Sequence, residues 1–300
     1  MKKILTVAML VLLATTLIVS CADPKAKAIN ITYDLNGGTL AEGVTNPTTA
    51  TAGEKVTPTG PTRDTSTQDV SNYSIDDYLY CDTASGVTTT YTFKGWKVEG
   101  ADDSTASETY TAGTEDVKLV AVWDTTSTAT SYTGIKLKNT VSTGTTVTLG
   151  SYNNSQLTWK VLSVDTANKK ALLFAANVVS TSMKNHTSSN LGYNYSWGNT
   201  SPIYNWFNNT TNTGFLKQCK LDNVSMVDNG NVGKVFLLSD DDVTTYLPND
   251  SDRTCDYSWW LRTGGSAQGT CKYVIADGGT VYDKQANTEC AVRPAFWISL

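Results

Sequence analysis

Hydrophobic and polar residues alternate in short runs along most of the chain, and turns rich in Gly, Asn and Asp separate these runs. Alternation with a period of two places successive side chains on opposite faces of a strand, whereas the three-to-four-residue spacing of helices is nearly absent. INITYDLNGG, residues 29–38, is the first example: Ile29, Ile31 and Tyr33 alternate before an Asn-Gly-Gly turn. The pattern predicts a mainly β protein.

The alternating runs fall into two groups. The first group ends with the runs YTFKGWKV (91–98) and VKLVAVWD (117–124), which we expect to be two strands. The Ser/Thr-rich stretch 125–140 lacks apolar spacing and is predicted to be a linker. Because the length exceeds the common size of one domain, we expect one domain at 29–124 and a second at 141–300.

The second group contains most of the aromatic residues and one clear helix signal. Ser201 can cap a short helix, Pro202 suits its first position, and Ile203, Trp206 and Phe207 share a face. The predicted elements are a hairpin over 157–178, this helix over 201–209, a strand over 234–239 followed by a helix start, a hairpin over 271–283 with an Asp-Gly turn, and a terminal strand over 292–300.

The amino terminus has the pattern of a secretion signal. Lys2 and Lys3 precede an apolar run, Ile4–Val19. As a helix this run would be about 24 Å long, short of the ~30 Å hydrocarbon core of a bilayer. Residues 1–20 are therefore predicted to be a signal peptide rather than a membrane span.

The end of this run, Ile18-Val19-Ser20-Cys21, resembles the lipobox of bacterial lipoproteins. The preferred form has Leu at the first position and Gly or Ala at the third, so the match is looser than ideal. The resemblance implies that Cys21 becomes the first mature residue and carries acyl chains, with residues 21–28 as a tether. The alternative is ordinary signal cleavage. We expect a lipoprotein of the outer membrane or cell surface, facing the extracytoplasmic side.

The charge of the chain excludes nucleic acid as a partner. The sequence has 23 basic and 28 acidic residues, and loss of residues 1–20 would remove two lysines, leaving 21 against 28, a net charge of −7. Binding to phosphates needs basic surface. The expected partners are the membrane, through the lipid anchor, and an extracellular glycan or protein.

Motifs in the first domain resemble the Listeria/Bacteroides repeat, the internalin-type B-repeat. The matching residues occur in the order of the family: Asn36-Gly37-Gly38, Pro61-Thr62-Arg63, Tyr91 to Trp96, and Trp123. The resemblance implies a β-grasp-like fold that serves as a spacer or adhesion module without catalysis. Residues 64–90 depart from the family, which has a very short link there. We interpret them as a solvated surface loop, with a private contact site as the alternative.

The order of motifs in the second domain, from W-K-V-L to V-R-P-A-F-W-I, resembles an uncharacterised module common at the carboxy ends of bacterial surface proteins. That module in turn resembles the C-type-lectin-like fold of the formylglycine-generating, sulfatase-modifying-factor superfamily. The resemblance implies an α+β domain in which Trp259, Leu261, Arg293 and Trp297 are structural. It also implies that the terminal strand pairs near the beginning of the domain.

Residues that carry chemistry are few. His186 is the only histidine, and the sequence has no Cys-x-x-Cys and no Gly-x-Ser-x-Gly. Asp240, Asp241 and Asp242 suggest calcium, but Ser239 with Asp242 three residues later is the pattern of a helix capping box. We expect no metal, no cofactor and no catalytic residue.

The cysteines offer one enzymatic alternative. Formylglycine-generating enzymes hold copper with a close carboxy-terminal cysteine pair, whereas Cys271 and Cys290 are nineteen residues apart in a different context. Besides Cys21 there are five cysteines, an odd number. We expect Cys81 to stay free and the other four to form disulfides in an unspecified pairing.

The segment SWWLRTGG, 258–265, contains two adjacent tryptophans. As a strand it would place Trp259 in the core and Trp260 with Arg262 on the opposite face. A stacked Trp260–Arg262 pair would be either a structural staple, which we favour, or an open platform for a ligand.

Further binding candidates lie in the loop between residues 183 and 199, which we expect to converge with the loop at 263–270. They are Tyr193, Tyr195 and Trp197. The sequence thus predicts a non-catalytic, lipid-anchored protein for adhesion or ligand binding. The alternatives are an enzyme of the formylglycine-generating type and a purely structural envelope protein.

Overall fold

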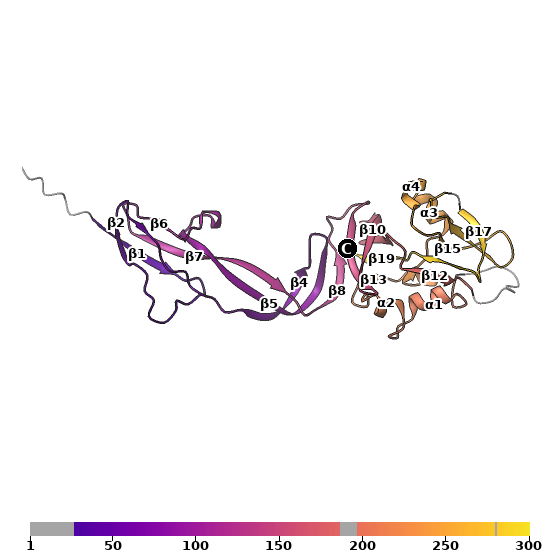
Figure 1. The fold of residues 1–300 in the computed structure, drawn as a ribbon, viewed down its shortest axis with the longest axis horizontal. Helices are drawn as coiled ribbons and strands as arrows, with labels where there is room; N and C mark the ends of the chain where they lie inside the picture. Colours follow the sequence, from indigo (N-terminus) through magenta and orange to yellow (C-terminus); the bar gives the residue numbers. More distant parts are fainter. Residues whose placement is uncertain (1–26, 187–196, 280) are drawn as a thin grey trace, which may run out of the picture. The chain divides into compact units, whose positions relative to one another are not determined.

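The computed structural model describes residues 27–186, 197–279 and 281–300 (Figure 1). Strands predominate over short helices, which confirms the mainly β class. The predicted signal peptide, the lipidation site Cys21 and most of the tether lie outside the described residues. Within the described residues no helix is long and apolar enough to cross a membrane.

The chain forms two compact units that interleave along the sequence. Unit 1 contains the described residues up to Ser66 together with Thr89–Ser127, and unit 2 contains Thr67–Thr88 and Thr128–Leu300. Strand β5 (Leu79–Val98) contributes its first half to unit 2 and its second half to unit 1.

In unit 1 the strands lie in the order β2-β1-β7-β5, and β1 runs parallel to β7. The predicted alternation in β1 is confirmed, because Ile29 and Ile31 are buried between exposed neighbours. Ile31 packs with Trp96, Leu119 and other apolar side chains in the core of this unit. The remaining elements are a small pair of strands, β3 and β6, and a 3-10 turn. The bounds are β1 Ala28–Asp34, β2 Thr49–Thr51, β3 Lys55–Val56, η1 Asp103–Thr105, β6 Tyr110–Thr111 and β7 Val117–Thr128.

Unit 2 contains two larger sheets with short helices around them (Figure 1). The first sheet has the order β13-β19-β11-β10-β9, and β14 also pairs with β19; the second has the order β12-β18-β15-β16-β17. The strands are β9 Thr146–Tyr152, β10 Ser155–Asp165, β11 Lys170–Ala175, β12 Ser180–Lys184, β13 Met226–Val227, β14 Val235–Phe236, β15 Trp259–Gly264, β16 Thr270–Val274, β17 Val281–Gln285, β18 Glu289–Val292 and β19 Ala295–Ser299. The helices are α1 Pro202–Asn208, α2 Phe215–Gln218, η2 Gly230–Val232, α3 Asp240–Tyr246 and α4 Asp250–Arg253.

Several local predictions in unit 2 are confirmed. β10 and β11 form the predicted hairpin, with Trp159 opposite Ala175. Helix α1 begins at Pro202, and the Ser201 side chain accepts a hydrogen bond from the Tyr204 backbone N–H. β16 and β17 pair across the predicted Asp-Gly turn. The terminal strand β19 pairs with β11, in the first quarter of the predicted domain 141–300.

Strand β15 separates two cores of unit 2. Trp260 packs into a large core together with Val161, whereas Trp259 packs into a second core together with Phe174. Both indoles are completely buried. Adjacent residues of a strand point to opposite faces, so burial of both tryptophans means that the sheet is covered on both faces at this point.

Two predicted boundaries are wrong. Residues 64–90 are not a solvated loop: they form β4 (Ser66–Ser74) and the first half of β5, and Leu79 and Cys81 are buried in the large core of unit 2. Residues 125–140 are not a linker either, because β8 (Ser131–Leu137) pairs antiparallel with β5. Ser and Thr outnumber the few apolar side chains that pack into the core in this stretch, so its composition resembles that of a linker.

Candidate functional site

Trp260 does not form an open platform. Its indole is completely buried, and its Nε1–H donates a hydrogen bond to the Met183 carbonyl, 2.8 Å away. The cation nearest its ring is the ammonium of Lys284, 5.8 Å from the ring centre, rather than Arg262. Trp260 is therefore a buried core residue, and the expected stack with Arg262 is not formed.

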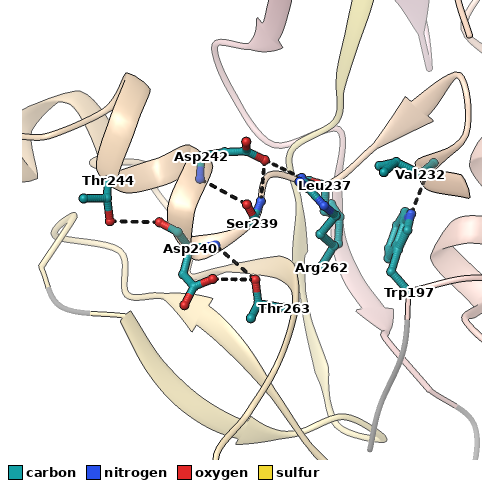
Figure 2. Close-up of polar contacts among 9 residues, drawn as sticks. All are labelled: Trp197, Val232, Leu237, Ser239, Asp240, Asp242, Thr244, Arg262 and Thr263. Carbon is teal, nitrogen blue, oxygen red and sulfur yellow. Dashed lines mark hydrogen bonds and ion pairs between the residues drawn. The ribbon is translucent and has the colours of Figure 1, made fainter. Parts of the chain in front are cut away.

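Arg262 instead fastens the start of helix α3 to strand β15 (Figure 2). Its Nη1 donates to the Leu237 carbonyl at 2.8 Å and forms an ion pair with Asp242. Asp242 in turn accepts from the backbone N–H of Ser239, and the Ser239 hydroxyl accepts from the Asp242 N–H. This is the predicted capping box. The guanidinium of Arg262 also lies over the ring of Phe236, 5.5 Å from its centre.

Within the aspartate triplet, the carboxylates of Asp240 and Asp242 are paired with donors from the protein itself. Burial alone would raise the pKa of Asp240, but hydrogen bonds from Lys272 and Thr263 outweigh it and hold that pKa below its ordinary value. The Thr263 hydroxyl donates to Asp240 at 2.8 Å (Figure 2), and Lys272 forms an ion pair with the same carboxylate. Asp242 is paired as described above and Asp241 is exposed. The described residues contain no group of three or more side chains arranged to hold a metal.

The predicted aromatic loop is described only in part. Tyr193 and Tyr195 lie outside the described residues. Trp197 is half-buried, and its Nε1–H donates to the Val232 carbonyl at 2.9 Å (Figure 2). Its ring meets that of Tyr204 edge to face, with the centres 5.5 Å apart. Trp197 therefore anchors the end of its loop against η2 and α1.

The two cysteines of the enzymatic alternative lie on strands that are not neighbours. Cys271 is on β16 and Cys290 on β18, with β15 between them. Two strand spacings put them at least about 9–10 Å apart, beyond the reach of a shared metal ion or a disulfide. Burial raises the pKa of both thiols, and the Cys290 thiol donates to the Ser258 carbonyl. All five described cysteines are free, so the predicted pairing of four is wrong.

A cleft that the sequence analysis missed lies at one end of the first sheet of unit 2. It has a volume of about 310 Å³ and lies between the β9–β10 turn and the segment that follows β11. We call it the Tyr152 cleft. The residues that matter for its chemistry are Tyr152, Asn153, Gln156, Leu157, Asn177 and Val178.

The polar side chains of the Tyr152 cleft are available to a ligand. Asn153, Gln156 and Asn177 are exposed, and none of the intramolecular hydrogen bonds in the described part of the chain uses their side-chain amides. No carboxylate, ammonium or guanidinium group lines the cleft. An amide offers both donors and an acceptor, so these three side chains can hydrogen-bond an uncharged polar ligand.

A buried arginine supports one wall of the cleft from behind. Arg293 donates from Nε to the Ala175 carbonyl at 3.1 Å and from Nη2 to the Ala176 carbonyl at 2.9 Å. Its guanidinium lies 4.2 Å from the ring centre of Phe174 and 5.0 Å from that of Trp259. Burial lowers its pKa to about 10, so it remains protonated at neutral pH. Arg293 therefore fixes the backbone of this wall.

Two other hollows in the described structure are lined in part by polar side chains that already have intramolecular partners. In unit 1 a hollow of about 360 Å³ is lined by Arg63, which donates to a backbone carbonyl, and by Lys97, which is paired with Asp103. In unit 2 a hollow of about 250 Å³ is lined by Asn208, whose amide bonds the backbone on both sides. The Tyr152 cleft is the stronger candidate because it brings together three side-chain amides that have no intramolecular partner among the described residues.

Residues 168–300 match a family model described as a domain of unknown function (DUF6273). No curated protein and no solved structure matches the chain. The matched span begins in the turn before β11, so it includes Asn177 and Val178 of the cleft, whereas Tyr152, Asn153 and Gln156 precede it.

Proposed function

We propose that the chain is a lipid-anchored, non-catalytic protein of the bacterial cell envelope that binds an extracellular ligand through unit 2. The single observation that carries the binding proposal is the Tyr152 cleft, which holds three amide side chains without intramolecular partners beside apolar residues. A few unused polar groups in a mostly preformed hollow are typical of ligand sites. The proposal of a lipid anchor is supported by the apolar run near the amino terminus and by Cys21.

We also propose that unit 1 is a β-grasp-like repeat of the internalin type that acts as a spacer. The residues that carry the resemblance converge in space, which supports the proposal. The Asn36 carbonyl accepts hydrogen bonds from Arg63 Nη1 at 3.0 Å and from Trp123 Nε1 at 3.1 Å. Arg63 also lies over the ring of Tyr91, 3.8 Å from its centre. One residue from each of the four motifs therefore takes part in a single set of contacts.

For unit 2 we propose a C-type-lectin-like fold. The pairing of β19 with β11 supports it, as do the short helices between two strand groups. Trp259 and Arg293, which the resemblance treats as structural, are buried in contact with each other. The strand between Cys271 and Cys290 disfavours an enzyme of the formylglycine-generating type, because a copper site would require both thiols on one ion.

The anchor is tested by labelling growing cells with radioactive palmitate. We compare the natural chain with Cys21→Ala and with a matched control, Cys255→Ser. Cys255 is the most accessible of the described cysteines. Label on the natural chain and the control, but not on Cys21→Ala, is the expected result. Label that survives in Cys21→Ala would refute lipidation at this residue.

Ligand binding is tested by probing glycan and protein arrays with the full chain and with the double variant Gln156→Ala/Asn177→Ala. The control is Tyr282→Ala, an exposed residue of β17 outside the cleft. We expect at least one ligand to be bound by the natural chain and the control and to be lost in the double variant. Arrays that stay blank, or ligands that the double variant binds equally well, would contradict the proposal.

A further inference from the structure

We infer that the ligand of the Tyr152 cleft is a neutral saccharide, an inference that rests on the proposed function of unit 2 in ligand binding. The first argument is the absence of charge. No carboxylate, ammonium or guanidinium group lines the cleft. A charged group placed there would lose part of its hydration without an opposite charge to replace it, which is unfavourable. The cleft therefore favours an uncharged ligand over an acidic glycan, a phosphate or a basic peptide.

The second argument is the type of polar group. Asn153, Gln156 and Asn177 each present an NH₂ donor pair and a carbonyl acceptor. Adjacent hydroxyl groups on a sugar ring each donate and accept one hydrogen bond, so a single amide can bind two of them at once. A peptide in an extended conformation is recognised mainly through its backbone, whereas the unused polar groups of this cleft are side-chain amides. Three amides around one hollow match a polyhydroxylated ring.

The third argument is the apolar surface beside the amides. Tyr152, Leu157 and Val178 line the same cleft, and Tyr152 is half-buried. The Tyr152 ring is held edge-on to that of Trp206, with the ring centres 5.9 Å apart. A sugar ring has C–H groups on its faces and hydroxyl groups on its rim, so it can contact apolar side chains and hydrogen-bond amides simultaneously. The volume of about 310 Å³ is at the small end of the range for small-molecule sites and suits one or two rings.

The fourth argument is the fixed geometry of the backbone. Asn153 and Asn154 both have positive φ, 49° and 64°, as a tight two-residue hairpin turn requires. On the opposite wall the Ala176 N–H donates to the Thr158 carbonyl at 2.8 Å, in addition to the bonds from Arg293 described above. Because the backbone on both sides is already ordered, binding pays little for fixing it.

The test titrates the full chain by calorimetry with neutral mono- and disaccharides of glucose, galactose, mannose and N-acetylglucosamine, and with glucuronate and a sialylated disaccharide. We expect a neutral sugar to bind and the acidic sugars to bind at least tenfold more weakly. Gln156→Ala and Asn177→Ala should each weaken binding about threefold to tenfold, the usual worth of one hydrogen bond. Asn287→Ala, an asparagine outside the cleft, is the matched control and should leave binding unchanged.

Three results would overturn the inference. Tighter binding of an acidic sugar or an array peptide that both cleft variants weaken would refute the ligand class and leave the proposed function intact. A neutral sugar whose binding is unchanged in both variants would refute the location. Failure of every neutral sugar to bind would refute the inference, and the arrays would then decide the proposed function separately. Both substituted side chains are exposed, so unchanged melting temperatures will show that the variants are folded.

Discussion

Replacing Trp260 with alanine should destabilise unit 2 more than any surface change. The indole is completely buried in the large core, and burial of a tryptophan removes ~150–250 Å² from water, worth about 4–6 kcal/mol at ~25 cal/mol per Å². Partial relaxation around the cavity brings the usual loss to about 3–5 kcal/mol. The variant also leaves the Met183 carbonyl without its donor, which adds about 1 kcal/mol.

The assay is thermal unfolding followed by calorimetry. For a unit of 150–250 residues, each kcal/mol lowers the melting temperature by about 2–4 °C, so a total loss of about 4–6 kcal/mol in Trp260→Ala should lower that of unit 2 by roughly 8–24 °C. Trp260→Phe keeps an aromatic ring but loses the indole N–H, and should fall between the alanine variant and the natural chain. Tyr282→Ala is the control, because Tyr282 is 48% exposed and its loss should change stability by less than about 0.5 kcal/mol.

A melting temperature for Trp260→Ala within about 2 °C of the natural chain would refute this reasoning, because a buried indole cannot be removed at so small a cost. Loss of ligand binding with no loss of stability would show that Trp260 is a binding residue after all.

Three further predictions concern other parts of the chain. In denaturant without reductant, all five described cysteines should react with a thiol reagent, whereas in the folded chain Cys219 should be protected, because burial raises its pKa to about 12 and shields it from the reagent. In unit 1 a Cβ on Gly38 would lie 2.6 Å from the Trp123 ring, so Gly38→Ala should lower the free energy of unfolding of unit 1 by about 1–3 kcal/mol in urea titrations. Asp240 has a lowered pKa in the folded state, so its charge stabilises the fold above the unfolded pKa of ~3.9 and this contribution is lost as the pH falls through the folded value; Asp240→Asn should therefore flatten the acid limb of the stability profile below about pH 4.

Fewer than five reactive thiols among the described cysteines in denaturant would reveal a disulfide. A Gly38→Ala chain as stable as the natural one would mean that the Trp123 ring moves aside at little cost. An acid limb equally steep in Asp240→Asn would assign the acid sensitivity to other carboxylates.

Local elements could be predicted from the sequence because their signals span only a few residues. The Ser239–Asp242 capping box, the Ser201 helix cap and the β10–β11 hairpin each depend on neighbours in the chain, and each is formed. That the side chains of Trp259 and Trp260 point to opposite faces could be predicted from strand geometry alone. The partners of Arg262 could not be predicted in this way, because Phe236, Leu237 and Asp242 come from a segment twenty or more residues away.

Features that depend on long-range pairing could not be predicted. The Asn153–Asn154 turn is a recognisable hairpin signal, but Asn177 comes beside it only through the pairing of β10 with both β9 and β11. The prediction of two disulfides rests on the number of cysteines. A disulfide requires two Cβ atoms to lie close together, and β15 separates Cys271 from Cys290. Residues 64–90 are predicted to be a loop because they lengthen a link that is very short in the repeat family, and that comparison carries no information about their packing into the core of unit 2.

The interleaving of the two units determines what a single proteolytic cut between them would do. The chain passes from one unit to the other at residues 66–67, 88–89 and 127–128. A single cut at residue 127 would leave the hairpin of residues 67–88 covalently attached to unit 1 and still packed into the core of unit 2 through Leu79, Cys81, Ala84 and Val87. A single cut at any of these crossings would therefore leave unit 2 associated with unit 1, whereas a single cut in an ordinary flexible linker would separate the two units.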